Sequence, residues 1–273
     1  MPPLCEQNRI ANVLGSIEER IENNNAICAE LEAMAKLLYD YWFVQFDFPD
    51  ENGKPYKSSG GKMVWSEELK REIPEGWEIG CVSDLGSIVT GSTPPTEHKE
   101  YFTDHGFAWA TPKDLSLLNG RYFFGGAVDL TEAGLKNSSG RLMPAGSILF
   151  TTRAPIGYIA ITANPACTNQ GFKSIVPDKR FGTEFVYQTL RNLTPQMQRV
   201  GVGSTFKEVS KEVFSAQPVV LPAHQVVLAY SKMTTDVQEM LKRYQEENAE
   251  LASLRDFLLP LLMNGQVVIN SDK

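Results

Sequence analysis

Polar and basic side chains between residues 99 and 207 have the types that contact nucleic acids. Arg and Lys side chains can reach phosphates or guanine edges, and Asn and Gln amides can pair with adenine. The candidates lie near glycines and are Lys99, Lys113, Arg121, Arg153, Asn169, Gln170, Lys173, Ser204, Thr205 and Lys207. These residue types favour contacts in a DNA groove or on its phosphates.

Each of these candidates also has a purely structural explanation. Arg153 could cap a hairpin, and the Asn169-Gln170 pair could satisfy buried backbone groups. Lys207 could be an ordinary solvated charge on the surface. The residue types alone leave both interpretations open.

No catalytic or cofactor motif stands out in the sequence. G-x-S-x-G, H-E-x-x-H, G-x-G-x-x-G and Walker sequences are all absent. The stretch SSGGKM is similar to a phosphate loop, but Tyr56 replaces its first glycine and Met63 its magnesium-binding hydroxyl. STPPT resembles the Asn-Pro-Pro loop of adenine methyltransferases, but Thr93 cannot hold an adenine amino group and Thr96 cannot stack on the base. A catalytic role is therefore not expected.

Composition adds further exclusions. The four cysteines are scattered without a C-x-x-C pair, which indicates unpaired thiols, and the three histidines match no zinc-site spacing. We find no signal peptide and no apolar run long enough to span a membrane, so a cytoplasmic protein is expected. The net charge is −7, yet residues 77–220 carry 13 basic and 12 acidic side chains. The middle of the chain could therefore still present a basic face.

Two long amphipathic helices are expected on either side of this middle region, at about residues 6–42 and 223–262. Their apolar side chains recur every three or four residues. The first stripe contains Leu14, Ile17, Ile21, Leu31, Met34 and Leu38, and Asn23 to Asn25 interrupt it. The second contains Met233, Val237, Met240, Leu251, Leu254 and Leu258. AELEAMAKLL at 29–38 and AELASLRDFLL at 249–259 are almost repeats, which favours a paired coiled coil over two unrelated helices packed on the body. Because both helices are attached to the same insert, the pair is expected to run antiparallel.

Between the helices the pattern changes to short β-segments separated by Gly, Pro and Asn, which predicts an α+β domain. ILFTT and YIAIT are expected to form a hairpin, residues 183–193 a helix capped by Thr183, and residues 209–214 another short helix. The predicted organisation is a first long helix at 1–45, a connector at 46–76, a compact mixed domain at 77–221, a second long helix at 222–263 and a tail at 264–273.

Several stretches also match the motifs of one known family, in the family's order. They are LLYDYWFVQFDFP with NGKPYKSSGGKMVWSEELKREIPEGW, then GSTPP, ILFTTRAPIGYIAI, NQGFKSI, GSTFKEVSKEVF with PVVLP, and LASLRDFLLPLLMNG. Together they resemble the specificity subunit of type I restriction-modification systems, and the resemblance covers essentially the whole chain. Full-length members contain two repeats of a target recognition domain followed by a helix. This chain resembles a version with one recognition domain, either a natural half or a truncation.

The resemblance implies a function. Residues 77–221 would read one half of a bipartite target in double-stranded DNA, with Ser92 and Thr93 of GSTPP added to the candidate contacts. The two helices would act as a spacer and as the dock for the modification subunit, which binds S-adenosylmethionine and methylates a flipped adenine. A restriction subunit that uses ATP would join for cleavage, and this chain itself would be non-catalytic and hold no cofactor.

Two alternatives remain open at this point. The chain could be a non-productive assembly modulator, which binds the modification subunit without reading DNA. Within the DNA-recognition hypothesis, two chains could also associate as a homodimer and read a palindrome in two halves.

Overall fold

The structure is a computed structural model that describes residues 3–138, 140–153, 155–202 and 208–267. Contacts divide the chain into two compact units, Met1–Ala35 with Asp236–Lys273, and Lys36–Thr235. Two long helices, α1 (Leu4–Tyr39) and α6 (His224–Met263), each contribute to both units. The predicted long helices are thus confirmed, and the second unit contains every described strand.

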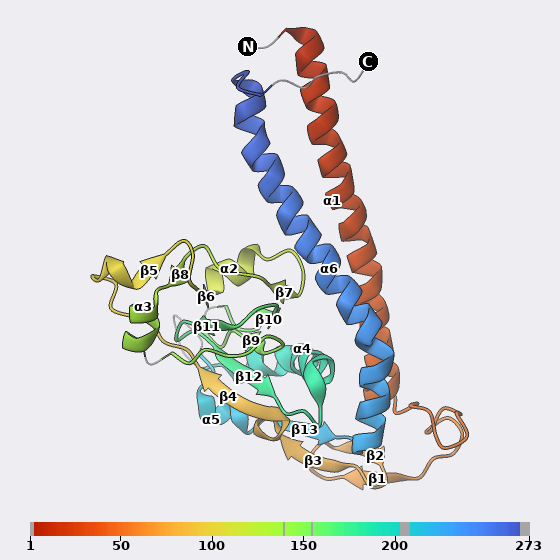
Figure 1. Ribbon diagram of the computed structural model, residues 1–273. Coiled ribbons are helices and arrows are strands. Elements are labelled where there is room, and N and C mark those ends of the chain that lie inside the picture. The colour runs from red at the N-terminus through yellow and green to blue at the C-terminus, as the bar shows by residue number, and fades with distance from the viewer. Residues whose placement is uncertain (1–2, 139, 154, 203–207, 268–273) are drawn as a thin grey trace. The chain divides into compact units, whose positions relative to one another are not determined.

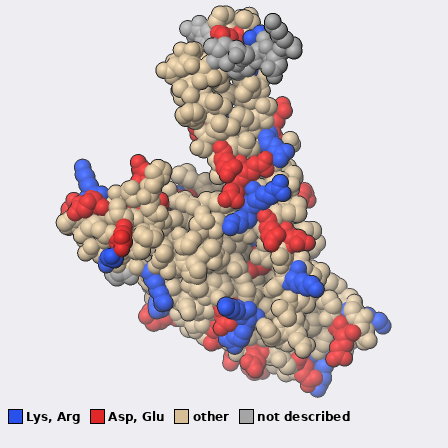
Figure 2. Space-filling view, viewed as in Figure 1, with Lys and Arg blue, Asp and Glu red and all other residues tan. Residues whose placement is uncertain are grey.

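The first unit is an antiparallel pair of helices, as predicted (Figure 1). Asn24 Nδ2 donates to Asn248 Oδ1 at 3.0 Å, and Asn248 Nδ2 donates to Asn25 Oδ1 at 2.9 Å. Basic and acidic side chains alternate on the visible face of the helices (Figure 2). Two ion pairs connect the helices in the same antiparallel order, Arg20 with Glu247 at 3.0 Å and Arg255 with Glu18 at 2.9 Å.

The seam between the helices differs from the predicted stripes. Ile17 is buried as expected, whereas the exposed fractions are 49% for Met34, 42% for Met240 and 45% for Leu254. Met233, in the second unit, is also exposed. The remaining predicted positions are half-buried: Leu14, Ile21, Leu31, Leu38, Val237, Leu251 and Leu258.

The reason is that polar side chains occupy buried positions on α6. Thr234, Leu241 and Gln245 are buried, so the buried face lies one residue further along than Met233 and Met240, a rotation of about 100°. The helix α1 is continuous through Asn23 to Asn25. Asn24 belongs to the contact between the helices, because it is buried and hydrogen-bonded to α6. On α6 the stripe of apolar residues alone therefore misses the centre of the buried face.

Two sheets form the framework of the second unit. The five-stranded sheet has the order β4 (Gly86–Thr90), β12 (Lys173–Pro177), β9 (Ile148–Phe150), β10 (Ile159–Thr162) and β7 (Tyr122–Phe123). The four-stranded sheet has the order β11 (Ala166–Thr168), β6 (Phe107–Ala110), β8 (Asp129–Leu130) and β5 (Phe102–Thr103). Val89, Leu149 and Phe123 of the first sheet share one apolar core with Ala110 and Ala166 of the second.

Smaller elements complete this unit. Two strand pairs lie outside the main sheets, β1 (Met63–Ser66) with β2 (Arg71–Pro74), and β3 (Glu78–Cys81) with β13 (Pro218–Leu221). The α-helices are α2 (Pro112–Leu117), α3 (Glu132–Asn137), α4 (Gly182–Val200) and α5 (Lys211–Ser215). Short helical turns are η1 (Asp40–Val44), η2 (Val82–Leu85) and η3 (Lys99–Tyr101).

The local predictions hold in part. β9 and β10 form the expected antiparallel hairpin, and α5 covers most of the short helix expected at 209–214. The helix expected at 183–193 is longer and begins at Gly182, and Thr183 does not cap it. The Thr183 hydroxyl donates instead to the backbone oxygen of Gly146 at 3.0 Å. The four cysteines are free thiols, as expected.

An aromatic cluster joins α1, η1, α4 and α6 within the second unit. The ring of Phe43 lies 4.8 Å from that of Phe185 and 4.9 Å from that of Tyr230, both with edge-on geometry. Tyr39 contacts all three rings, and its hydroxyl lies 3.0 Å from Thr189 Oγ1. Burial raises the pKa of Tyr39, so this hydroxyl stays protonated. The cluster fixes the ends of both long helices against α4.

Arg121 is a structural residue, which corrects its prediction as a DNA contact. Its Nη1 lies 2.5 Å from Glu184 Oε2, and both side chains are 1% exposed. The guanidinium also lies over the Tyr187 ring, 4.7 Å from the centroid. A buried charge needs a partner of this kind, so the side chain cannot reach a DNA groove.

We expect the substitution Arg121→Met to lower the free energy of unfolding by about 3–5 kcal/mol, because it leaves the Glu184 carboxylate buried without its counter-charge. The double variant Arg121→Met/Glu184→Gln should recover much of this loss, since the introduced amide is neutral and can still pair with Gln188. Urea denaturation of the three proteins measures both effects. A loss below about 1 kcal/mol in the single variant would contradict this account.

A second prediction concerns the asparagine contacts of the helix pair. Asn248→Ala removes the acceptor of the buried Asn24 amide, so we expect local stability to fall by about 1–3 kcal/mol. Hydrogen exchange of the α1 amides around Asn24 measures the change. Glu250→Ala, an exposed position two residues further along α6, is the control and should change exchange by less than about 0.5 kcal/mol. Equal exchange in both variants would show that the asparagines do not support the pairing.

Candidate nucleic-acid interface

The ends of four strands from both sheets meet at one edge of the second unit. β4 and β9 run in the same direction because both pair antiparallel with β12, and β6 runs parallel to β11. Backbone hydrogen bonds join the segments that follow these strands. They run from Ser92 N to Thr168 O at 2.8 Å, from Asn169 N to Ala110 O at 3.0 Å, and from Thr152 N to Gly171 O at 2.8 Å.

We call residues 91–95, 111–114, 151–153 and 169–173 the loop cluster. It contains seven of the candidate contacts, although they are up to 81 residues apart in the sequence. They are Ser92, Thr93, Lys113, Arg153, Asn169, Gln170 and Lys173. Side chains from four loops are thereby available to a single ligand at this edge.

Amide and hydroxyl groups form one half of the loop cluster. Thr93 Oγ1 donates to Gln170 Oε1, and Gln170 is exposed. Asn169 Oδ1 accepts from the backbone N–H of Gly171 at 2.9 Å, so this amide oxygen holds the turn. Gly91 is needed for the close approach, because a Cβ atom there would lie 2.1 Å from Asn169 O. Gln170 is therefore the better placed of the two amides to contact a ligand.

A basic group forms the other half. Arg153 is exposed, and its Nε lies 3.9 Å from Glu208 Oε2. Lys173 is only 6% exposed, and burial lowers its pKa while the carboxylates of Glu208 and Glu212 oppose this shift. Arg153 and Lys211 are close enough to lower the same pKa through charge repulsion. Three cations near two carboxylates make a site that an anion such as phosphate would favour.

Lys211 was missed in the sequence, where it was assigned only to a short helix. It is exposed in the first turn of α5, which Ser210 caps by accepting a hydrogen bond from Val213 N at 3.2 Å. Its place beside Lys173 depends on the fold, because 38 positions separate the two residues. In the sequence, only the presence of a lysine in the segment VSKEVF could have indicated that Lys211 belongs to the basic group.

Lys113 is exposed on α2. Thr111 caps this helix in a capping box with Asp114, and Pro112 is its first residue. A Cβ atom at Gly171 would lie 3.2 Å from Pro112, so the start of the helix packs on the 169–171 turn. The cap thus fixes Lys113 beside the amide half of the loop cluster.

The other candidates lie elsewhere. Lys99 is exposed in η3, just before β5, which is at the opposite edge of its sheet from β11. Ser204, Thr205 and Lys207 lie outside the described residues. Val202 and Glu208, which lie on either side of them in the sequence, pair through two backbone hydrogen bonds. The backbone of Glu208 also forms an isolated antiparallel β-bridge with that of Arg153.

Within the part of the chain that the structure describes, no group of three or more His, Cys, Asp or Glu side chains could hold a metal ion. No described helix has a stretch long and apolar enough to cross a lipid bilayer.

Comparison with known proteins identifies the family. Residues 74–237 match the type I restriction modification DNA specificity domain. The chain belongs to this family. Its matched region includes the whole loop cluster and both main sheets.

Relatives carry the same description. The MjaIX specificity subunit of Methanocaldococcus jannaschii is 32% identical over 199 residues, which cover 71% of this chain and 46% of the relative. The HindI specificity subunit of Haemophilus influenzae is 26% identical, covering 98% of this chain and 68% of the relative. The chain thus spans about half the length of the first relative. These names agree with the prediction of a specificity component rather than an enzyme.

A solved structure supports the predicted fold class. The crystal structure of the type I restriction-modification S subunit from M. genitalium aligns with a TM-score of 0.59 and 17% identity. The alignment covers 98% of this chain and 62% of that one. An α+β domain flanked by two long antiparallel helices is therefore the architecture of this chain.

The basic group gives a prediction that separates binding from folding. Lys173→Met keeps the buried methylene volume and removes a charge, so we expect stability to change by less than about 1 kcal/mol. Affinity for duplex DNA should fall about 2- to 3-fold, because the ammonium is 6% exposed and attracts phosphates through its field rather than by direct contact. Lys179→Met is the control, because Lys179 is exposed beyond the other end of β12. Equal DNA affinity in the two variants would remove Lys173 from the interface.

Proposed function

We propose that the chain is the DNA-recognition subunit of a type I restriction-modification complex, and that it reads one half of a bipartite target. The observation that carries this proposal is the loop cluster, where exposed Gln170, Arg153 and Lys113 meet at one edge of two sheets. Membership of a DNA specificity family supports the same role.

The chemistry of the loop cluster suits groove reading. The Gln170 amide has the donor and acceptor that an adenine edge requires in the major groove. Arg153 and Lys211 would contact phosphates or a guanine edge, and Lys113 would neutralise a further phosphate. Because Thr93 pairs with Gln170, a base must replace the Thr93 hydroxyl or share the amide with it. The two halves of the loop cluster thus combine base reading with backbone anchoring.

The helix pair is proposed as the dock for the adenine-methylating modification subunit. Several large apolar side chains of the first unit are exposed. Among them are Met34, Met240, Leu254 and Phe257, with exposed fractions of 42–65%. Exposed apolar side chains of this size favour a protein partner. In this proposal the partner binds S-adenosylmethionine, a restriction subunit supplies ATP-dependent cleavage, and the chain itself works in the cytoplasm without a cofactor.

One recognition domain reads only one half of a split target, so the second half needs another domain. It would come from a second copy of this chain in a homodimer, or from a different recognition domain. A homodimer would place two identical domains about a two-fold axis and read a palindrome.

The test is single-molecule methylation sequencing of DNA from cells that co-express this chain with its modification subunit. We expect adenine methylation at a split sequence, and the variant Gln170→Ala should lose methylation or accept more than one base at one position. A palindromic target would indicate the homodimer, and an asymmetric target would indicate another recognition domain.

The control is Lys179→Ala, which should leave the methylated sequence unchanged because Lys179 lies beyond the opposite end of β12. A stable complex of the two proteins without methylation would contradict the proposal. That result would instead favour a non-productive assembly modulator, which occupies the modification subunit without reading DNA.

A further inference from the structure

A cavity of about 200 Å³ lies in the second unit, with walls from η1, β2, α4 and β13. We call it the Arg71 cavity, after the charged side chain in its wall. It is smaller than a typical pocket for a drug-sized ligand and suits a group of a few heavy atoms. None of the candidate DNA contacts lines it.

Contacts with the wall fix the position of the Arg71 guanidinium. Its Nη2 donates to the backbone oxygen of Val44 at 2.8 Å, and its carbon lies 4.5 Å from the centroid of the Phe46 ring. Tyr39, another wall residue, is close enough to influence the pKa of Arg71. The charged end of this side chain therefore lies at the cavity and is in place before a ligand arrives.

Arg71 has no counter-charge. Among the described residues it forms no ion pair with a carboxylate, and only one of its five N–H donors has a protein partner. The side chain is half-buried, and burial lowers the pKa of Arg71 without an opposing carboxylate. Asp40, which lies near Asn192 of the wall, is already paired with Lys36. A partly desolvated cation with free donors favours an anionic ligand.

The rest of the wall indicates the kind of anion. Leu69, Leu193 and Val220 are half-buried and Val44 is 41% exposed, so aliphatic surface is accessible beside the charge. The planar guanidinium matches the two oxygens of a carboxylate. A phosphate monoester carries about two negative charges, and the described lining residues include no second cation to balance it.

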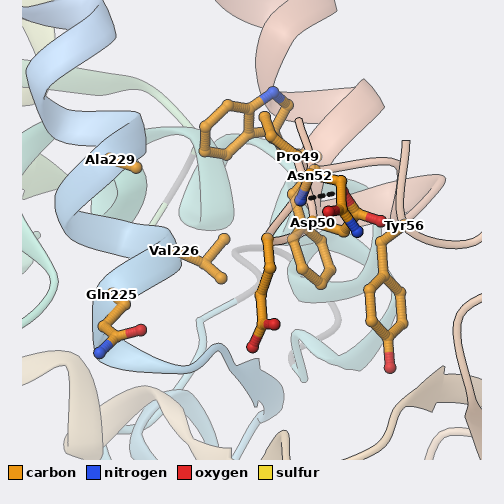
Figure 3. A pocket seen from close by; sticks show the side chains of 10 residues that line it. Pro49, Asp50, Asn52, Tyr56, Gln225, Val226 and Ala229 are labelled. Carbon is orange, nitrogen blue, oxygen red and sulfur yellow. Dashed lines mark hydrogen bonds between the residues drawn. The ribbon is translucent and has the colours of Figure 1, made fainter. Parts of the chain in front are cut away.

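A larger cavity of the second unit has the opposite charge. It measures about 470 Å³ and lies between the connector and the first turns of α6 (Figure 3). Its charged lining residues are Asp50 and Glu51, which repel an organic acid. Trp42 lines this cavity and Trp77 lines the Arg71 cavity, so the two indole rings report on the two cavities separately.

We propose that the Arg71 cavity binds the carboxylate of a small acid that carries a short aliphatic group. The carboxylate pairs with the Arg71 guanidinium, and the aliphatic group lies against Leu69 and Leu193. A free organic acid and the C-terminal residue of a protein chain both supply this chemistry. The site is separate from the loop cluster, and its occupation does not depend on DNA reading.

The first experiment titrates the intact ¹⁵N-labelled chain with 4-methylpentanoate and follows the indole N–H signals of Trp77 and Trp42 by NMR. We expect a saturable shift of the Trp77 signal, with a Kd in the millimolar range, and a smaller shift of the Trp42 signal. The neutral 4-methylpentanamide has nearly the same shape and should bind at least about 10-fold more weakly. Equal binding of acid and amide, or no saturable shift at Trp77, would overturn the proposal.

A second ligand identifies the source of the carboxylate. N-acetylleucine presents the same side chain and carboxylate as the C-terminal residue of a protein chain. Tighter binding of N-acetylleucine than of 4-methylpentanoate would support the carboxylate site with a chain end as its ligand. The reverse order would support the same site with a free acid as its ligand.

Variants assign the binding to Arg71. Arg71→Gln should weaken 4-methylpentanoate binding at least about 10-fold, whereas Arg71→Lys keeps the charge without the planar fork and should weaken it only about 2- to 5-fold. Lys70→Gln is the control, because Lys70 is an exposed neighbouring cation that does not line the cavity. Wild-type affinity in Arg71→Gln would overturn the proposal. Thermal denaturation shows whether each variant folds, and the comparison of acid with amide uses the unaltered chain.

Discussion

The contact on which the second unit depends most is the aromatic cluster of Tyr39, Phe43, Phe185 and Tyr230. It joins residues from α1, η1, α4 and α6 that are up to 191 positions apart in sequence. Edge-on aromatic pairs are directional, so the cluster fixes orientation as well as burying apolar surface. The ends of α1 and α6 are therefore anchored on α4.

An ion pair and strand pairing connect α4 to the loop cluster. Glu184, next to Phe185, pairs with Arg121, and the backbone oxygen of Arg121 accepts from Ile161 N at 2.6 Å. This places β7 beside β10, and β10 pairs with β9, whose far end leads into Thr152 and Arg153. A buried ion pair deep in the domain thus supports side chains at the edge that we propose to contact DNA. This supporting contact accounts for the position of Arg121 inside the core, although arginine is a residue type that often contacts DNA.

The sequence predicted which helices and strands form better than it predicted which face of each helix is buried. The two long helices and the β9–β10 hairpin follow from local periodicity and turn residues, whereas α4 extends seven residues beyond the helix expected at 183–193. The buried face of α6 does not follow from periodicity, because Thr234 and Gln245 are buried while Met233 and Met240 are exposed. Arg121 likewise looked like a surface cation, since nothing near it in sequence reveals Glu184, 63 residues away. The proximity of Lys173 and Lys211 depends on long-range strand pairing, which the local sequence pattern does not predict.

The most direct test of the central claim is a photo-crosslink from the loop cluster to DNA in the complex with the modification subunit. The variants Gln170→p-benzoylphenylalanine and Lys179→p-benzoylphenylalanine carry the same probe at opposite ends of the five-stranded sheet region, and both positions are exposed. Our account predicts a crosslink from position 170 to one base of the methylated target and none from position 179. A crosslink from position 179 alone would place the DNA at the opposite end and contradict the account.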